Sequence, residues 1–121
     1  MTKVQKVQHV TTVSTEDELY ELPNTGPKDL LEAALAACAL KTTKEVLERD
    51  GIEYDEADLY AEATATLTKA PARFNEFSVS IVLPSLPESY DQEKMMISIE
   101  RGCIIGNTLK HQGSVSFHKE S

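Results

Sequence analysis

The chain has 121 residues, 40% of them hydrophobic, with two cysteines, no tryptophan and a formal net charge of −8. This length suffices for one hydrophobic core but not two, so we expect a single domain over residues 1–121. The acidic surplus disfavours nucleic acid and anionic membranes as partners, because both attract basic surfaces. A membrane span would need about 18 consecutive apolar residues, and none is present. Residues 1–10 contain no apolar leader segment, so we expect a cytoplasmic protein.

The N-terminal part of the chain predicts one strand and one long helix. Residues 3–13 carry valines among threonines and glutamines, which predicts a strand. Pro27 suits the first position of a helix, and Thr25 or Gly26 can cap it. Apolar residues three and four apart then predict a long helix that ends just before Gly51, a natural C-terminal cap. We expect the core to form around this helix.

The remaining chain predicts a hairpin, a second helix and a last strand. Residues 57–68 and 74–83 each alternate between apolar and polar side chains, with a turn between them. A second helix is predicted to start at Ser89 or Asp91, and residues 114–118 predict a final strand. The order β–α–β–β–α–β indicates an α+β fold, in which a mainly antiparallel sheet covers a long central cysteine-bearing helix and a second helix.

The two cysteines lie far apart in the sequence and in different settings. Cys38 lies in the middle of the predicted long helix, and Cys103 lies near a helix end, two residues after Arg101. A reactive cysteine needs a stabilised thiolate, which requires a positive neighbour or hydrogen-bond donors. The pair can be a nucleophile with its resolving partner or two inert core thiols, and their spacing leaves both readings open.

Other site motifs are weak. The histidines His9, His111 and His118 and the two cysteines do not form any of the pairs with metal-ligand spacing, and no glycine-rich nucleotide motif is present. We therefore expect neither a metal nor another cofactor.

Two segments resemble the OsmC/Ohr family, the osmotically induced protein C and organic hydroperoxide resistance proteins. Residues 26–38 resemble the family's helix motif of proline, two polar residues, Leu-Leu, alanines and cysteine. Residues 103–109 resemble its second motif, in which a Thr-Leu pair follows a cysteine. The resemblance covers roughly residues 23–119. It implies an intertwined homodimer with active sites at the subunit interface and thiol-dependent reduction of organic hydroperoxides.

The resemblance also assigns roles to individual residues. Cys38 matches the nucleophile that attacks the peroxide and becomes a sulfenic acid, and Cys103 matches the resolving thiol that forms a disulfide with it. An external dithiol reductant would restore both thiols. The implied substrate pocket is apolar and suits an alkyl hydroperoxide. Its expected lining residues are Ala34, Leu35, Met95, Met96, Ile104 and Ile105.

The chain departs from the family pattern around the nucleophile. Family members carry an acidic residue after the motif proline and an arginine in their N-terminal part, whereas Lys28 follows the proline here and no arginine precedes Arg49. We expect the supporting charge to come from Lys28, Arg101 or Arg73. The N-terminal region is shorter than in full-length members, so we expect a strand or two fewer. These departures keep an alternative open: a non-catalytic dimeric binding module with an apolar pocket.

Overall fold

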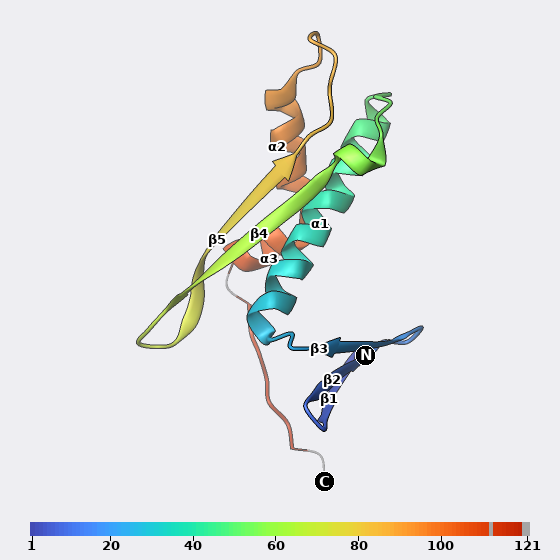
Figure 1. The fold of residues 1–121 in the computed structure, drawn as a ribbon. Coiled ribbons are helices and arrows are strands. Elements are labelled where there is room, and N and C mark those ends of the chain that lie inside the picture. Colours follow the sequence, from blue (N-terminus) through green and yellow to red (C-terminus); the bar gives the residue numbers. More distant parts are fainter. Residues whose placement is uncertain (112, 120–121) are drawn as a thin grey trace. The chain divides into compact units, whose positions relative to one another are not determined.

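The computed structural model describes residues 1–111 and 113–119 and contains two antiparallel sheets and three α-helices in that part of the chain (Figure 1). A compact N-terminal unit runs from Met1 to Leu31, and a second compact unit begins at Glu32. The antiparallel sheets and the long cysteine-bearing helix confirm the expected α+β class. The single domain stays a prediction.

The N-terminal unit holds three strands where a single strand over residues 3–13 was expected, and that expectation was wrong. The expected shortening relative to full-length family members stays a prediction. β1 (Lys3–Val7), β2 (Val10–Ser14) and β3 (Leu19–Pro23) pair antiparallel in that order. The chain reverses at Gln8 and His9, whose φ angles are 51° and 69°. Two consecutive left-handed residues match the right-handed twist of a tight hairpin.

The hairpin explains the spacing of three between the valines of this region. Val7 lies opposite Val10 and Val4 lies opposite Val13 across the strand pair. The pattern therefore comes from cross-strand pairs on two short strands, and it does not follow the period of two that one continuous strand would show.

Helix α1 (Pro27–Arg49) confirms the predicted long helix. At its start the Gly26 N–H donates to the Asp29 carboxylate at 3.1 Å, which satisfies one of the free donors of the first turn. At its end Gly51 adopts a φ of 70°, the left-handed conformation of a C-terminal cap. The buried side chains fall on one face: Leu35, Ala39, Thr42, Thr43, Val46 and Leu47.

Strands β4 (Tyr60–Thr68) and β5 (Arg73–Val82) form the predicted hairpin, after a short 3₁₀ turn over Glu56–Asp58. Figure 1 shows the hairpin lying along α1. The apolar face of the hairpin packs on the helices through Ala61, Ala63, Phe77 and Ile81. The Ala65 N–H of β4 also donates to the Glu32 carboxylate of α1 at 2.8 Å.

Helix α2 (Gln92–Gly102) begins at the predicted cap Asp91, whose carboxylate accepts from the Lys94 N–H at 3.1 Å. A further helix, α3 (Ile104–Lys110), follows after a single residue and was not predicted. Cys103 is that single residue. α1, α2 and the residue just before β4 share a core of buried side chains: Val46, Leu47, Leu59, Met95 and Ile99.

The predicted final strand is not formed, and that expectation was wrong. Residues 113–119 have no regular secondary structure, and Val115 and Phe117 are 80% and 94% exposed. A strand needs hydrogen bonds to a neighbour, and the described part of this chain provides no strand that pairs with this segment.

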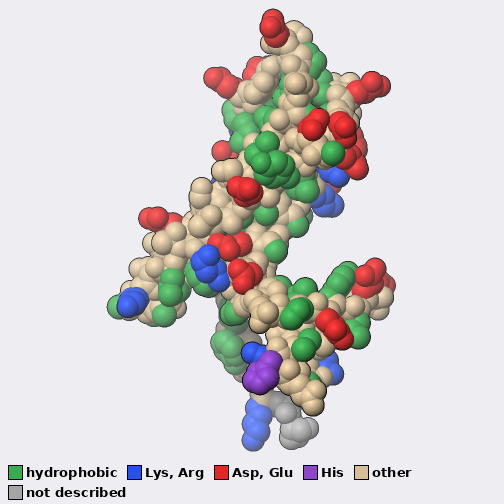
Figure 2. Space-filling model, in the orientation of Figure 1, with side chains coloured by type: hydrophobic (Ala, Val, Ile, Leu, Met, Phe, Trp, Pro, Cys, Tyr) green, Lys and Arg blue, Asp and Glu red, His purple; other side chains and the backbone are tan. Residues whose placement is uncertain are grey.

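The surface reflects the acidic composition. On the face shown in Figure 2, acidic side chains outnumber basic ones and gather at the end of the second unit where α1 ends. None of the described helices is both long enough and apolar enough to cross a membrane.

Candidate functional site

The two cysteines come together in the second unit, in a small cluster between α1, the hairpin and α3. Leu35, Ala39 and Cys103 are its buried members, and Cys38 packs against them. Both cysteines are free thiols; Cys38 is half-buried in the middle of α1, and Cys103 is buried between α2 and α3. The fold therefore brings together two thiols that are far apart in the sequence.

Two glycines leave room on either side of Cys103. A Cβ atom at Gly102 would lie 2.9 Å from the Thr42 methyl group of α1, too close for any larger residue without a shift. The Thr42 side chain is itself fixed, because its hydroxyl donates to the Cys38 carbonyl at 2.9 Å. A Cβ atom at Gly106 would lie 3.3 Å from the Cys103 sulfur. Gly102 thus lets the chain approach α1 closely, and Gly106 makes room for the Cys103 side chain.

The surroundings of Cys38 favour its thiolate. The backbone N–H of Ile105 has the largest effect, and the Cys103 thiol, the N–H of Ile104 and the Lys41 charge add to it; together they lower the pKa of Cys38, against the opposing effect of burial. Ile104 and Ile105 are the first residues of α3, whose N–H groups have no partner within the helix. A thiolate at this position is the reactive form of the cysteine.

Cys103 has the opposite tendency. Burial raises its pKa most, the Gly106 N–H counteracts this, and the hydrogen bond to Cys38 raises it further, because that bond requires the Cys103 proton. When one of the two thiols is ionised, the opposite shifts therefore favour the charge on Cys38, which accepts a hydrogen bond from a protonated Cys103.

Two lysines that were not singled out from the sequence act on the thiols. Lys41 acts on Cys38 and Lys110 acts on Cys103. Among the expected residues, Arg73 lies beside the hairpin turn and donates to the Pro71 carbonyl at 3.3 Å, and Arg101 is exposed at the end of α2. Lys28 lies in the N-terminal unit, and its role stays a prediction.

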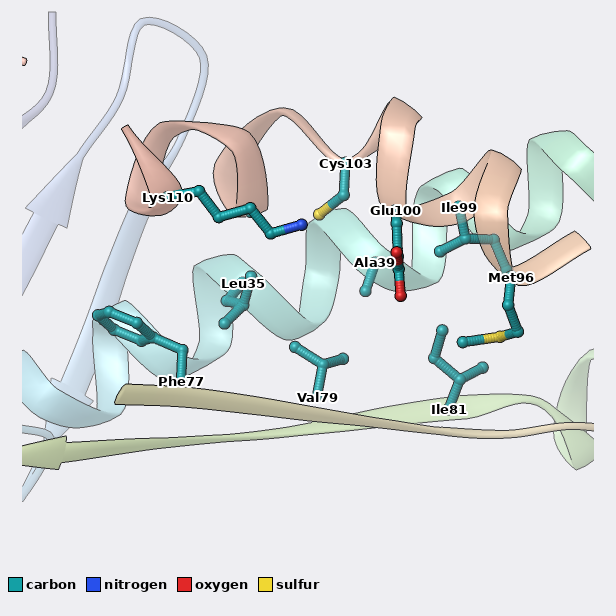
Figure 3. A pocket seen from close by; sticks show the side chains of 11 residues that line it. Leu35, Ala39, Phe77, Val79, Ile81, Met96, Ile99, Glu100, Cys103 and Lys110 are labelled. Carbon is teal, nitrogen blue, oxygen red and sulfur yellow. The ribbon is translucent and has the colours of Figure 1, made fainter. Parts of the chain in front are cut away.

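A cavity of about 280 Å³ borders the cluster and is open to solvent. Figure 3 shows Leu35 and Ala39 of α1 and Phe77, Val79 and Ile81 of β5 around it. The Cys103 sulfur and the Lys110 amine point toward one another in this cavity, and the Glu100 carboxylate also turns into it (Figure 3). The lining is thus largely apolar, with one thiol and two opposite charges.

The expected lining residues are divided between this cavity and other positions. Leu35 and Met96 line it as expected. Met95 instead lies in the core between α1 and α2 at 1% exposure, and the side chains of Ala34 and Ile104 are exposed. Ile105 packs against the cysteine cluster without lining the cavity, so its contribution to the site is mainly its backbone N–H.

Across the described residues, no three histidine, cysteine or carboxylate side chains gather closely enough to hold a metal ion. A scan against protein families matches residues 16–118 to the OsmC-like protein family. This chain belongs to the OsmC-like family. A comparison with curated proteins gives no match.

Solved OsmC-like structures have the same fold at low sequence identity. The OsmC-like protein of Mycoplasma pneumoniae has a TM-score of 0.74 at 16% identity, and the match covers 91% of this chain and 86% of that one. The organic hydroperoxide resistance protein OsmC of Legionella pneumophila has a TM-score of 0.64 at 18% identity, covering 91% and 88%. The organic hydroperoxide resistance protein of Elizabethkingia anophelis has a TM-score of 0.61 at 14% identity, covering 88% and 84%. These likenesses establish the fold.

Several residues of this OsmC-like site were not predicted from the sequence, although two of them had a usable signal. Lys41 lies three residues after Cys38 and Glu100 lies three residues before Cys103, a spacing that places two side chains of one helix on the same face. Lys110 had no such signal, because its approach to Cys103 depends on α3, which was not predicted.

Proposed function

We propose that this OsmC-like protein is a thiol-dependent peroxidase that reduces organic hydroperoxides, with Cys38 as the nucleophile and Cys103 as the resolving thiol. The observation that carries the proposal is the unequal pair of thiols: the pKa of Cys38 is lowered and that of Cys103 is raised where the two meet. A difference in pKa suits a nucleophile with its resolving partner, because one sulfur attacks as a thiolate while the other remains a protonated thiol.

The proposed cycle balances in three steps. The Cys38 thiolate attacks the terminal peroxide oxygen, the O–O bond breaks, Cys38 becomes a sulfenic acid and the alkoxide takes a proton to leave as an alcohol. The Cys103 sulfur then attacks the Cys38 sulfur, forming a disulfide and releasing water. An external dithiol finally reduces the disulfide by thiol–disulfide exchange and is itself oxidised.

An alkyl hydroperoxide suits the apolar surroundings better than hydrogen peroxide. Leu35, Phe77 and Val79 offer apolar surface beside the thiols, and burial of each methylene of an alkyl chain is worth roughly 0.8 kcal/mol. The fold relatives from Legionella pneumophila and Elizabethkingia anophelis are described as organic hydroperoxide resistance proteins, which supports the same substrate class for this chain.

The proposal includes the working form of the protein. We propose one OsmC-like domain over residues 1–121 that acts as a homodimer in the cytoplasm, with no cofactor. The exposed apolar side chains of β1, β3 and the C-terminal segment support a partner surface, among them Val4, Leu19 and Phe117. Lys28, Arg101 or Arg73 can supply supporting charge to Cys38 in that assembly, in addition to Lys41.

A second candidate is a non-catalytic dimeric binding module. The absence of any arginine before Arg49 favours it, because the family's activating arginine comes from that part of the chain. The apolar cavity would then bind a ligand without chemistry, and both thiols would be unreactive toward peroxides.

Single-turnover kinetics distinguish the two candidates. Reduced wild-type protein should consume one equivalent of cumene hydroperoxide, and Cys38→Ser should consume none. Cys103→Ser should consume one equivalent and accumulate a sulfenic acid that dimedone traps on Cys38. Equal, slow consumption by all three proteins would favour the binding module.

A further inference from the structure

We infer that the external dithiol attacks the Cys103 sulfur of the oxidised protein from the cavity, so that Cys38 leaves as the thiolate and Lys110 assists the attack. This inference rests on the proposed peroxidase cycle and specifies its reductive half. In the oxidised protein, after the alcohol product has left, it assigns the cavity to the reductant, and it gives Lys110 a role as a positioning residue.

The geometry of the cavity favours attack at Cys103. Cys103 lines the cavity, whereas Cys38 is not among its lining residues. The Lys110 amine and the Cys103 sulfur point toward one another within it (Figure 3). A thiolate that enters the cavity therefore meets the Cys103 sulfur beside a positive charge, which attracts the anion and stabilises the negative charge shared by the three sulfurs during exchange.

The chemistry of exchange favours the same direction. The entering thiolate forms a bond to the Cys103 sulfur, the Cys38–Cys103 bond breaks, and Cys38 takes the electron pair. Cys38 is the better leaving group, because the N–H groups of Ile105 and Ile104 stabilise its thiolate and lower its pKa. The second thiol of the reductant then attacks the mixed disulfide, which leaves an oxidised dithiol and a reprotonated Cys103.

Attack at Cys38 is the competing route, because Cys38 is the more exposed cysteine in the reduced protein. That route would expel Cys103, whose thiolate is disfavoured by burial. The exposure of Cys38 thus predicts a mixed disulfide on Cys38, whereas the better leaving group predicts a mixed disulfide on Cys103. The position of the mixed disulfide distinguishes the two routes.

The first test maps that mixed disulfide. The protein is oxidised with diamide, which makes the disulfide without peroxide, mixed briefly with 2-mercaptoethanesulfonate, quenched in acid and alkylated with N-ethylmaleimide. Trypsin cleaves after lysine and arginine, so Cys38 falls in residues 29–41 and Cys103 in residues 102–110. We expect the sulfonate adduct on residues 102–110 and the maleimide on residues 29–41.

The opposite distribution overturns the inference while leaving the peroxidase cycle standing. Failure of diamide to form the disulfide also overturns it, since the reductant would then have no bond to attack. Failure of the hydroperoxide to oxidise the protein, with the adduct still on Cys103, would count against the proposed function alone.

The second test separates Lys110 from Lys41. Lys110→Gln should slow reduction by 2-mercaptoethanesulfonate roughly threefold to tenfold at low salt, an effect that fades as salt screens the charge. Its rate of oxidation by cumene hydroperoxide should fall less than its rate of reduction, because Lys110 acts on Cys103 whereas the cation acting on Cys38 is Lys41. Lys94→Gln, an exposed lysine of α2 away from the cavity, is the matched control. Equal reduction rates in Lys110→Gln and Lys94→Gln would show that Lys110 does not assist the attack on Cys103. An equal loss of rate in the reduction and the oxidation of Lys110→Gln would show the same.

Discussion

Cys38 and Cys103 meet where α3 begins, and three peptide N–H groups are directed at the two sulfurs. Those of Ile105 and Ile104 act on Cys38, and that of Gly106 acts on Cys103. Cys38 also accepts a hydrogen bond from the Cys103 thiol. This bond and the peptide dipoles of Ile104 and Ile105 together favour a negative charge on the Cys38 sulfur. The neighbouring backbone thus favours the Cys38 thiolate, although no arginine precedes Arg49 in this chain.

The hydrogen bond between the two thiols predicts a difference between two substitutions of Cys103. Cys103→Ala removes the donor, whereas Cys103→Ser keeps a hydroxyl donor of similar size. The pKa of Cys38 should therefore be higher in the alanine variant than in the serine variant, and its reaction with hydroperoxide at neutral pH should be slower. Thiolate absorbance at 240 nm as a function of pH measures this pKa, and identical titrations would rule out the hydrogen bond as a cause.

At the scale of elements, the contact between α2 and α1 positions Cys103. Alanine favours helix over glycine, so Gly102→Ala would stabilise α2 if its Cβ met nothing. Because that Cβ would lie 2.9 Å from the Thr42 methyl group, we expect a loss of about 1–3 kcal/mol in the free energy of unfolding. Disulfide formation after peroxide addition should slow as well.

A second substitution tests the cause of that loss. Thr42→Ser removes the methyl group and keeps the hydroxyl that donates to the Cys38 carbonyl. The double variant Gly102→Ala/Thr42→Ser should regain most of the lost stability in urea denaturation. Gly113→Ala is the control, since nothing lies within 4 Å of its Cβ position. A double variant no more stable than Gly102→Ala would refute the steric explanation.

We expect the stability of the contact between the end of α1 and the segment before α2 to depend on pH. The Tyr90 hydroxyl donates to the Asp50 carboxylate at 2.6 Å, and burial and this bond raise the pKa of Tyr90 to about 12. The unfolded value is about 10, so the folded state holds this proton more tightly. The resulting stability is complete below pH ~10 and is lost as pH rises toward 12.

Tyr90→Phe removes the titrating group and isolates its contribution. We expect the wild-type protein to lose more free energy of unfolding than Tyr90→Phe between pH 9 and pH 11, measured by urea denaturation at matched ionic strength. Parallel curves for the two proteins would show that Tyr90 does not couple to folding in this range.

At the scale of the whole molecule, apolar surface remains uncovered in both units. β1 is exposed along its length, and Val115 and Phe117 are largely exposed in a segment whose alternation predicts a strand. Strand-forming side chains without a pairing strand in their own chain are consistent with pairing to a second copy. This supports the proposed homodimer.

The dimer gives a prediction of its own. Light scattering at micromolar concentration should report twice the mass of one chain, and Phe117→Ser should shift the equilibrium toward monomer. Tyr60→Ser, which also removes an exposed aromatic residue, serves as the control. A wild-type protein that stays monomeric at all concentrations would contradict the dimer.

The sequence predicts well those elements whose periodicity is long or strict. α1 has buried residues three and four apart from Leu35 to Leu47, and the hairpin alternates over two strands, so both were found. The first hairpin was missed, because Gln8 and His9 are not typical residues of a tight turn. α3 was missed, because it is short and Cys103 at its start makes no side-chain cap.

The candidate site was predictable only in part. The cysteines followed from the resemblance of two motifs, and Lys41 could have followed from helix geometry. The cavity depends on long-range packing of β5 against α1 and α3, which no local pattern reports. The adjacent residues Met95 and Met96 of α2 illustrate this, because Met96 lines the cavity whereas Met95 lies in the core.

A thiol count with intact mass, made on reduced protein before and after one equivalent of cumene hydroperoxide, tests the Cys38–Cys103 cycle directly. We expect rapid loss of both thiols, a mass lower by two hydrogens, and a tryptic species that links residues 29–41 to residues 102–110. Two surviving thiols and an unchanged mass would contradict the peroxidase cycle and leave the binding module as the function of this fold.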